Sequence, residues 1–172
     1  MIKHIRTFLL LACTTACFTT FASINQGTVY QAKVDLVKVD KSSRKMYLYA
    51  GDKLVKKYHI ALGSQPKGHK ERVGDERTPE GEYKLDYIKE DSSFYRAMHI
   101  SYPNKQDIER AREKGVNPGG FIMIHGQKNG TEHRAKMAQR FNWTNGCIAL
   151  TNEEMDEFLA LVESGTKISI EW

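Results

Sequence analysis

The chain has 172 residues, of which 40% are hydrophobic and 27% are charged, and its formal net charge is +5. This composition is that of an ordinary folded domain and excludes a disordered, collagen-like or polytopic membrane chain. The excess of basic residues is mild and scattered, so the charge gives little support to nucleic-acid binding.

The first 22 residues have the three-part layout of a secretory signal peptide. Lys3 and Arg6 form a basic opening, an apolar stretch runs from Phe8 to Phe18, and Thr20-Phe21-Ala22 ends in small residues. The apolar stretch is well short of the roughly 20 residues that a membrane-spanning helix needs. We therefore expect residues 1–22 to be a signal peptide that is cleaved after Ala22.

The cysteines support this expectation. Cys13 and Cys17 lie inside the expected signal peptide, so cleavage would leave Cys147 as the one thiol of an exported protein. A structural cysteine in an oxidising compartment normally has a partner, so Cys147 is either a small buried hydrophobe or a reactive group. In an alternative, Leu10-Leu11-Ala12-Cys13 is a lipoprotein processing site and a lipid on Cys13 anchors the chain.

Residues 23–33 are polar, and we expect them to be a lead-in to a single domain over residues 34–172. Apolar alternation at the start of this domain predicts three strands joined by tight polar turns as a β-meander, at residues 34–39, 46–49 and 54–62. Residues 63–81 are rich in glycine and charge and predict a long loop, which is either functional or an ordinary solvated loop.

The second half of the domain mixes strands with short helices. Capping residues predict helices over 105–114 and 152–162, and residues 131–140 are weakly helical. Apolar runs predict the remaining strands at residues 82–88, 94–102, 121–124 and 167–172. The expected fold class is therefore α+β and β-rich, with a mixed sheet and a few short helices.

The chemistry points to one thiol and one imidazole. Phosphate-binding, dinucleotide and zincin motifs are absent from the sequence, so we expect neither cofactor nor metal. Cys147 follows a polar, glycine-containing turn, and His125 ends a buried strand. An imidazole can lower a thiol pKa from near 8.5 to roughly 3.5–7.5, which makes the sulfur nucleophilic. The alternative is an inert cysteine and a core histidine that do not interact.

In the first interpretation each residue has a defined task. His125 would take the thiol proton and return it to a departing amine, while Gly146 would let backbone N–H groups approach the developing oxyanion.

The order of several short segments resembles the L,D-transpeptidase (YkuD) family. These segments cover most of residues 36–172 and are Val39-Asp40-Lys41, Met46-Tyr47-Leu48-Tyr49, Ala61-Leu62-Gly63, Thr78-Pro79-Glu80-Gly81, Ile124-His125-Gly126 and Thr144-Asn145-Gly146-Cys147-Ile148. The resemblance implies a periplasmic, YkuD-like catalytic domain in which Cys147 forms a thioester with a peptidoglycan stem peptide. It also implies that His125 is the base and that the pocket is shaped by Gly126, Thr144, Asn145 and Gly146.

The segment around the thiol departs from the usual family ending, Ser-x-Gly-Cys-Ile-Arg. Thr144 replaces Ser, Asn145 fills the variable place, and Ala149 stands where Arg is expected. This form resembles a YafK-like branch, which is associated with hydrolytic release of lipoprotein from murein. Three functions therefore stay open: transfer to an amine, hydrolysis as an amidase that acts on murein-linked lipoprotein, and a catalytically silent wall-binding module.

Other side chains are candidates with two interpretations each. Arg72, Arg77 and the neighbouring Lys70 would meet stem-peptide carboxylates, or belong to a solvated charged loop. Tyr83 and Trp143 would line the cleft, or only pack. His133 would be a second base or a metal ligand, or a surface residue.

Overall fold

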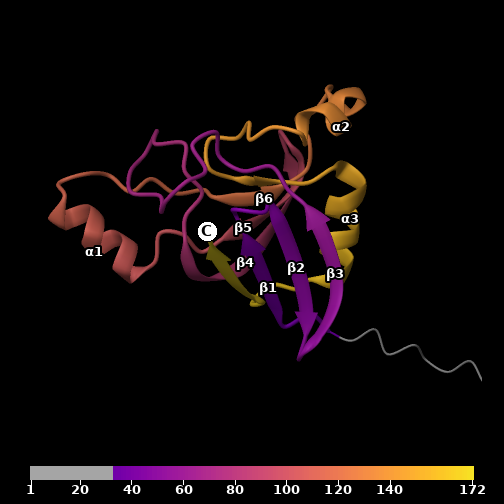
Figure 1. The fold of residues 1–172 in the computed structure, drawn as a ribbon, viewed down its shortest axis with the longest axis horizontal. Coiled ribbons are helices and arrows are strands. Elements are labelled where there is room, and N and C mark those ends of the chain that lie inside the picture. The colour runs from indigo at the N-terminus through magenta and orange to yellow at the C-terminus, as the bar shows by residue number, and fades with distance from the viewer. Residues whose placement is uncertain (1–32) are drawn as a thin grey trace, which may run out of the picture. The chain divides into compact units, whose positions relative to one another are not determined.

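The computed structural model describes residues 33–172, which form an eight-stranded sheet with short helices around it (Figure 1). The order of the strands across the sheet is β3-β2-β1-β8-β4-β5-β6-β7. The strands are β1 (Leu36–Asp40), β2 (Lys45–Ala50), β3 (Lys53–His59), β4 (Gly81–Ser92), β5 (Tyr95–Ile100), β6 (Met123–His125), β7 (Ile148–Ala149) and β8 (Lys167–Glu171). The β-rich α+β class is thereby confirmed. The expected signal peptide, the alternative at Cys13 and nearly all of the polar lead-in lie outside the described residues.

The first three strands form the predicted β-meander, since β1 pairs antiparallel with β2 and β2 pairs antiparallel with β3. Alternate side chains point into the core, as the pleat of a strand requires. Val37 and Val39 of β1 are buried, and so are Met46 and Leu48 of β2. The C-terminal strand β8 then pairs in parallel with β1, which joins the two ends of the domain.

Strand β4 connects this half of the sheet to the half that carries the thiol. Its first residues pair with β8, and its later residues pair antiparallel with β5. Beyond β5 the sheet continues through β6 to β7, and these last two strands are parallel. The turn before β7 therefore lies beside the start of β6.

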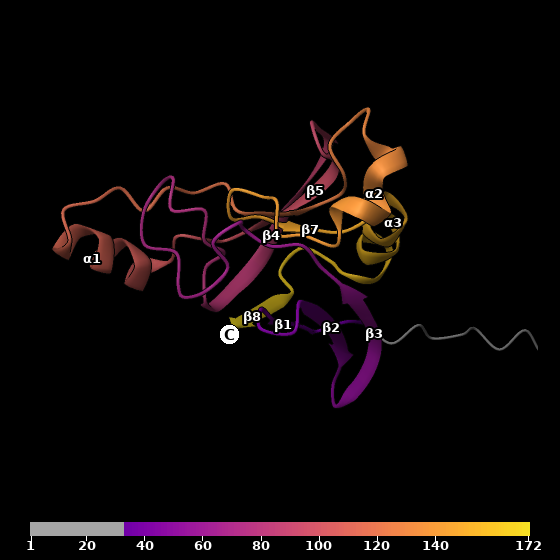
Figure 2. The same ribbon diagram turned by 45° about the horizontal axis from the view of Figure 1, so that its top comes forward.

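Three short helices and one 3-10 turn complete the fold: α1 (Lys105–Glu113), η1 (Glu132–Arg134), α2 (Ala135–Ala138) and α3 (Asn152–Leu161). Capping boxes begin α1 at Asn104 and α3 at Thr151. Helix α3 buries Met155 and Phe158 in the core, whereas α1 lies at the other end of the domain from α3 (Figure 2). Among the described residues, none of the helices has the length and apolar character required to span a membrane.

The long loop between β3 and β4 is an ordered part of the fold. The buried Lys41 ammonium donates to the carbonyls of Gly68 and Thr78 at 2.8 Å and to Glu80 Oε1 at 2.9 Å. Burial lowers the pKa of Lys41, and the Glu80 carboxylate opposes that shift. A buried ammonium needs such partners. These three hydrogen bonds therefore hold the loop in place, and the loop is not merely a solvated surface segment.

Candidate active site

The pairing of β6 with β7 sets the positions of the imidazole and the thiol. In this parallel pair Ile124 is opposite Ile148, and His125 is opposite Ala149. Paired residues share a face of a sheet, and so do residues two apart along one strand. Cys147 directly precedes β7, two residues before Ala149, so it lies on the same side of the sheet as His125.

The two side chains also line one pocket, with a volume of about 880 Å³. Its walls include aromatic residues, among them Phe94 and Trp143. Cys147 is partly exposed and His125 retains 4% exposure, so the sulfur is open to a ligand while the ring is nearly enclosed. This arrangement favours a reactive thiol over an inert core cysteine.

His125 is held as a neutral ring with one nitrogen free for chemistry. Its Nδ1 lies 2.7 Å from the Gly126 carbonyl oxygen and donates to it, because a carbonyl can only accept. Phe94 and Trp143 pack on the ring with centroid distances of 4.6 and 5.7 Å. Burial lowers the pKa of His125 to about 4, against a smaller opposing effect of the Gly126 hydrogen bond. At neutral pH the proton is therefore on Nδ1, and Nε2 is a base.

The thiol of Cys147 is also neutral in the resting protein. Burial raises its pKa above the ordinary value of 9.0, although a backbone hydrogen bond from Met123 and the charge of Lys70 act in the opposite direction. Its Sγ lies 3.7 Å from the Phe121 carbonyl oxygen, which can accept the thiol proton in a weak hydrogen bond. The predicted lowering of the thiol pKa is therefore wrong. The site instead pairs a thiol with a neutral imidazole.

The turn that leads into the thiol depends on Gly146 and Thr144. Gly146 has φ of +122°, and a Cβ there would lie 2.6 Å from the Arg77 carbonyl oxygen, so only glycine fits without strain. Thr144 Oγ1 donates to the Cys147 carbonyl at 2.7 Å and accepts from the Gly146 N–H at 3.2 Å. Because this N–H is already paired, Gly146 shapes the turn and is not a free oxyanion donor in the resting protein.

Gly126 and Asn145 have different positions around the same site. A Cβ on Gly126 would lie 2.6 Å from Asn152 Oδ1 and 2.9 Å from Tyr95 Cβ, so this glycine permits close packing behind His125. Asn145 is exposed and lines the pocket wall beside Cys147.

Comparison with known proteins agrees with this geometry. Residues 35–170 match the family model for YkuD, the L,D-transpeptidase catalytic domain. The chain belongs to the L,D-transpeptidase (YkuD) family. YafK of Escherichia coli (strain K12), which carries the name of an L,D-transpeptidase, is 31% identical over 132 residues, or 73% of this chain and 46% of YafK.

Solved structures support the same YkuD fold. The helical cell shape determining protein Pgp2 from Campylobacter jejuni aligns with a TM-score of 0.60 and 26% identity, over 80% of this chain and 47% of Pgp2. An L,D-transpeptidase from Xylanimonas cellulosilytica aligns with a TM-score of 0.53 and 13% identity, over 83% of this chain and 62% of that one, which bears on the fold alone. The chain thus spans about half the length of the curated relatives it matches.

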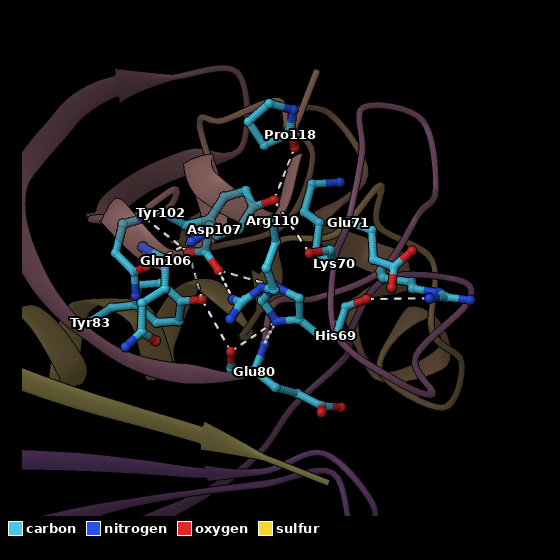
Figure 3. Close-up of polar contacts among 12 residues, drawn as sticks. His69, Lys70, Glu71, Glu80, Tyr83, Tyr102, Gln106, Asp107, Arg110 and Pro118 are labelled. Atoms are coloured by element: carbon cyan, nitrogen blue, oxygen red, sulfur yellow. Dashed lines mark hydrogen bonds and ion pairs between the residues drawn. The ribbon is translucent and has the colours of Figure 1, made fainter. Parts of the chain in front are cut away.

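Several predicted substrate-binding residues lie elsewhere in this YkuD domain. Trp143 lines the large pocket as expected, but Arg72, Arg77 and Tyr83 are absent from the walls of the two pockets that contain Cys147. Arg77 donates to the His69 carbonyl at 3.3 Å. The buried Tyr83 hydroxyl donates to Asp107 Oδ2 at 3.1 Å, within the polar cluster of Figure 3.

His133 is exposed in η1, where its Nε2 accepts a hydrogen bond from Arg134 at 3.2 Å, and it is likewise absent from the walls of the two pockets that contain Cys147. Within residues 33–172 no three His, Cys, Asp or Glu side chains are grouped so that they could hold a metal ion.

A second, smaller pocket of about 370 Å³ also reaches Cys147. Lys70 and Glu76 of the long loop line it, and Phe121 lines both pockets. Lys70 was one of three basic candidates in the sequence, whereas Glu76 and Phe121 carried no recognisable signal. Phe121 has φ of +54° and a 79% exposed side chain, features that depend on tertiary structure.

Proposed function

We propose that this YkuD domain is a cysteine-dependent acyl-transfer enzyme that acts on peptidoglycan stem peptides. The observation that carries this proposal is that Cys147, directly before β7, and the neutral imidazole of His125, at the end of the paired strand β6, line one pocket. A nucleophile beside a base that is itself oriented by a third group is the usual signature of nucleophilic catalysis. Here the orienting group is the Gly126 carbonyl.

The proposed reaction begins with transfer of the thiol proton to His125 Nε2 as Sγ attacks the peptide carbonyl carbon. The tetrahedral intermediate collapses when its carbon–nitrogen bond breaks, and His125 returns the proton to the departing amine. A second amine, or water, then gives up a proton to His125 and attacks the thioester. The products are a new amide or a free acid, and the Cys147 thiol is restored.

The family membership supports an activity of the peptidoglycan transpeptidase or amidase type. Because the curated relatives are about twice as long as the matched region, the substrates and partners of the whole protein belong to the proposal. We also propose that residues 1–22 direct export, which would place the domain in the periplasm beside its substrate.

A product assay with two substrates tests the proposal. The protein is incubated with tetrapeptide muropeptides and an amine acceptor and, separately, with lipoprotein-linked murein, and the products are identified by mass spectrometry. We expect a product from at least one substrate with the wild type and none with Cys147→Ala. Retention of the wild type on murein without any product would instead indicate a wall-binding module.

Hydrolysis of the same thioester is the second candidate, and the position of Ala149 favours it. Ala149 is fully buried opposite His125, at the place where the family usually carries arginine. A methyl group offers no charge to fix the carboxylate of an incoming acceptor. In isotopically labelled water, hydrolysis would place heavy oxygen in the product acid, whereas transfer to an amine would not.

A further inference from the structure

The sulfur of Cys147 lies where two different pockets meet. The large pocket contains His125 in its wall, and the small pocket contains Lys70 and Glu76. An acyl-transfer reaction has two components on either side of the bond that breaks, an acyl part and an amine part. Two pockets that share the nucleophile can receive these two parts separately.

The position of the base decides which part occupies which pocket. His125 must reach the departing amine nitrogen to protonate it, and it must reach the incoming amine or water to deprotonate it. Both nitrogens therefore belong on the side of the large pocket, where His125 lies. The acyl part then extends from the sulfur into the small pocket.

Lys70 presents a fixed positive charge to the small pocket. Its buried ammonium donates to Asp75 Oδ1 at 2.7 Å and to the Arg72 carbonyl at 3.1 Å. An ammonium group has three N–H donors, and these two acceptors are the partners that the described residues supply. One N–H donor is thus available to a ligand.

Asp75 stays ionised and holds this lysine in position. Burial acts to raise the pKa of Asp75, but hydrogen bonds from Lys70 and from the backbone N–H groups of Arg72, Glu71 and Arg77 outweigh it and lower the pKa to about 2. The Asp75 carboxylate is therefore hydrogen-bonded to several donors. Its negative charge is not spent on Lys70 alone, so the Lys70 ammonium keeps part of its positive charge for a ligand.

Glu76 adds a negative charge to the same pocket. It has φ of +57°, a conformation that is uncommon outside glycine and tends to occur at functional sites. Its carbonyl accepts from the Gln65 N–H at 3.2 Å, and its Oε2 accepts from the Ser64 hydroxyl. Glu76 as a whole is half-buried and lines the pocket that Lys70 also lines.

We propose that the small pocket binds the acyl donor by a zwitterionic amino-acid head group, with Lys70 paired to its carboxylate and Glu76 to its ammonium. This inference rests on the proposed acyl-transfer function and names the specificity of the same site. The family usually carries arginine where this domain has Ala149. Lys70 of the long loop then supplies a cation near the thiol instead.

Three acyl donors test this assignment: one with an intact amino-acid head group, one with that carboxylate as a carboxamide, and one with that amine acetylated. Thioester formation is followed by intact-mass spectrometry for the wild type, Lys70→Met, Glu76→Gln and the control Lys67→Gln. Lys67 is an exposed residue of the same loop. Each result is the ratio of the rates of thioester formation with two donors, measured on the same variant. Differences between variants in the fraction of folded protein therefore cancel.

We expect the wild type to prefer the carboxylate over the carboxamide by about tenfold to a hundredfold, the range for a charge-assisted hydrogen bond. Lys70→Met should remove this preference and leave the preference for the free amine, Glu76→Gln should do the reverse, and Lys67→Gln should keep both. Because Lys70 is buried, the Glu76→Gln arm decides the question if Lys70→Met does not fold.

Wild-type thioester formation at equal rates with all three donors would overturn this assignment and leave the proposed function standing. If Lys70→Met and Glu76→Gln both kept the wild-type preferences for the carboxylate and the free amine, the assignment would likewise be overturned and the proposed function would stand. A wild type that forms no thioester with any donor would overturn the proposed function, and the assignment with it.

Discussion

Two histidines of this domain lie in opposite kinds of surroundings. His69 Nε2 is 3.1 Å from Asp107 Oδ1, and its Nδ1 accepts from the Glu80 N–H at 3.0 Å, so both ring nitrogens have protein partners (Figure 3). His125 uses Nδ1 for the Gly126 carbonyl, and its ring otherwise packs among aromatic side chains beside a pocket.

The surroundings of the two histidines distinguish polar groups that stabilise the fold from polar groups that are free to contact a substrate. In the first cluster Asp107 also accepts from Tyr83, from the Asn104 N–H and from Arg110, which joins helix α1 to β4 and the long loop. A buried network in which each group is paired stabilises structure. A nearly enclosed base with one free nitrogen beside a thiol is suited to catalysis.

The largest expected effect separates the two histidines directly. His125→Asn should slow thioester formation by about 10²–10⁴-fold, since general acid–base catalysis contributes that much. His69→Asn should leave the rate per folded molecule within about threefold, because its ring belongs to the structural cluster. Single-turnover mass spectrometry measures both rates, and equal losses in the two variants would contradict the distinction.

Asp107→Ala should chiefly lower stability. Removal of one partner from a buried charge pair costs about 3–5 kcal/mol, and we expect the lower end because Arg110 is half-exposed. Urea unfolding measures the loss. Glu109→Ala, which removes an exposed carboxylate paired with Arg112 on the same helix, is the control and should cost less than about 1 kcal/mol.

Gly146→Ala should damage both stability and catalysis, because the turn before the thiol requires φ of +122° and close contact with the Arg77 carbonyl. A strained backbone conformation alone costs about 1–3 kcal/mol. Gly130→Ala is a matched control, since Gly130 has φ of +81° but nothing within 4 Å of a Cβ. A loss of thioester formation in Gly146→Ala that Gly130→Ala does not share would locate the effect at the site.

The pH dependence should show a neutral pair in the resting protein. Burial raises the pKa of Cys147 above 9.0, so alkylation by iodoacetamide should increase with pH toward a midpoint above that value. A midpoint within roughly 3.5–7.5 would indicate the thiolate–imidazolium pair instead.

The pKa of His125 also has a consequence for stability. Burial lowers this pKa from 6.5 to about 4, so on acidification the unfolded chain binds the proton first. The free energy of unfolding should therefore fall as the pH decreases from 6.5 to about 4, and His125→Asn should remove that part of the dependence. Urea unfolding across this pH range measures it.

The smallest effect is expected for Arg72→Gln. Arg72 is exposed, and it is absent from the walls of the two pockets that contain Cys147. Donor preference and rate should stay within about twofold of the wild type, as is usual for surface substitutions. A tenfold change would restore Arg72 as a substrate-binding residue.

Local sequence patterns predicted most of the fold and the two central residues. Alternation located the strands, and the helix starts at Asn104 and Thr151 followed from capping residues. Cys147 and His125 could be selected because few residue types can supply a nucleophile and a base. The parallel pairing of β1 with β8 was not predictable in this way, because it joins segments from the two ends of the domain.

The charged residues were harder to predict because their roles depend on distant partners. Lys41 is buried by contacts to residues 27 to 39 positions away. Among the basic candidates of the long loop, Lys70 lines a pocket, whereas Arg77 turns toward the His69 carbonyl. Adjacent charges in a sequence carry no signal of which one the folded loop will bury.

The most direct test of the central claim is the intact mass of the protein after exposure to a stem-peptide donor. We predict an added mass equal to the donor without its leaving amine, located on Cys147, formed much more slowly in His125→Asn and absent in Cys147→Ala. A folded wild type that gains no such mass, or a Cys147→Ala variant that gains the same mass, would contradict the claim.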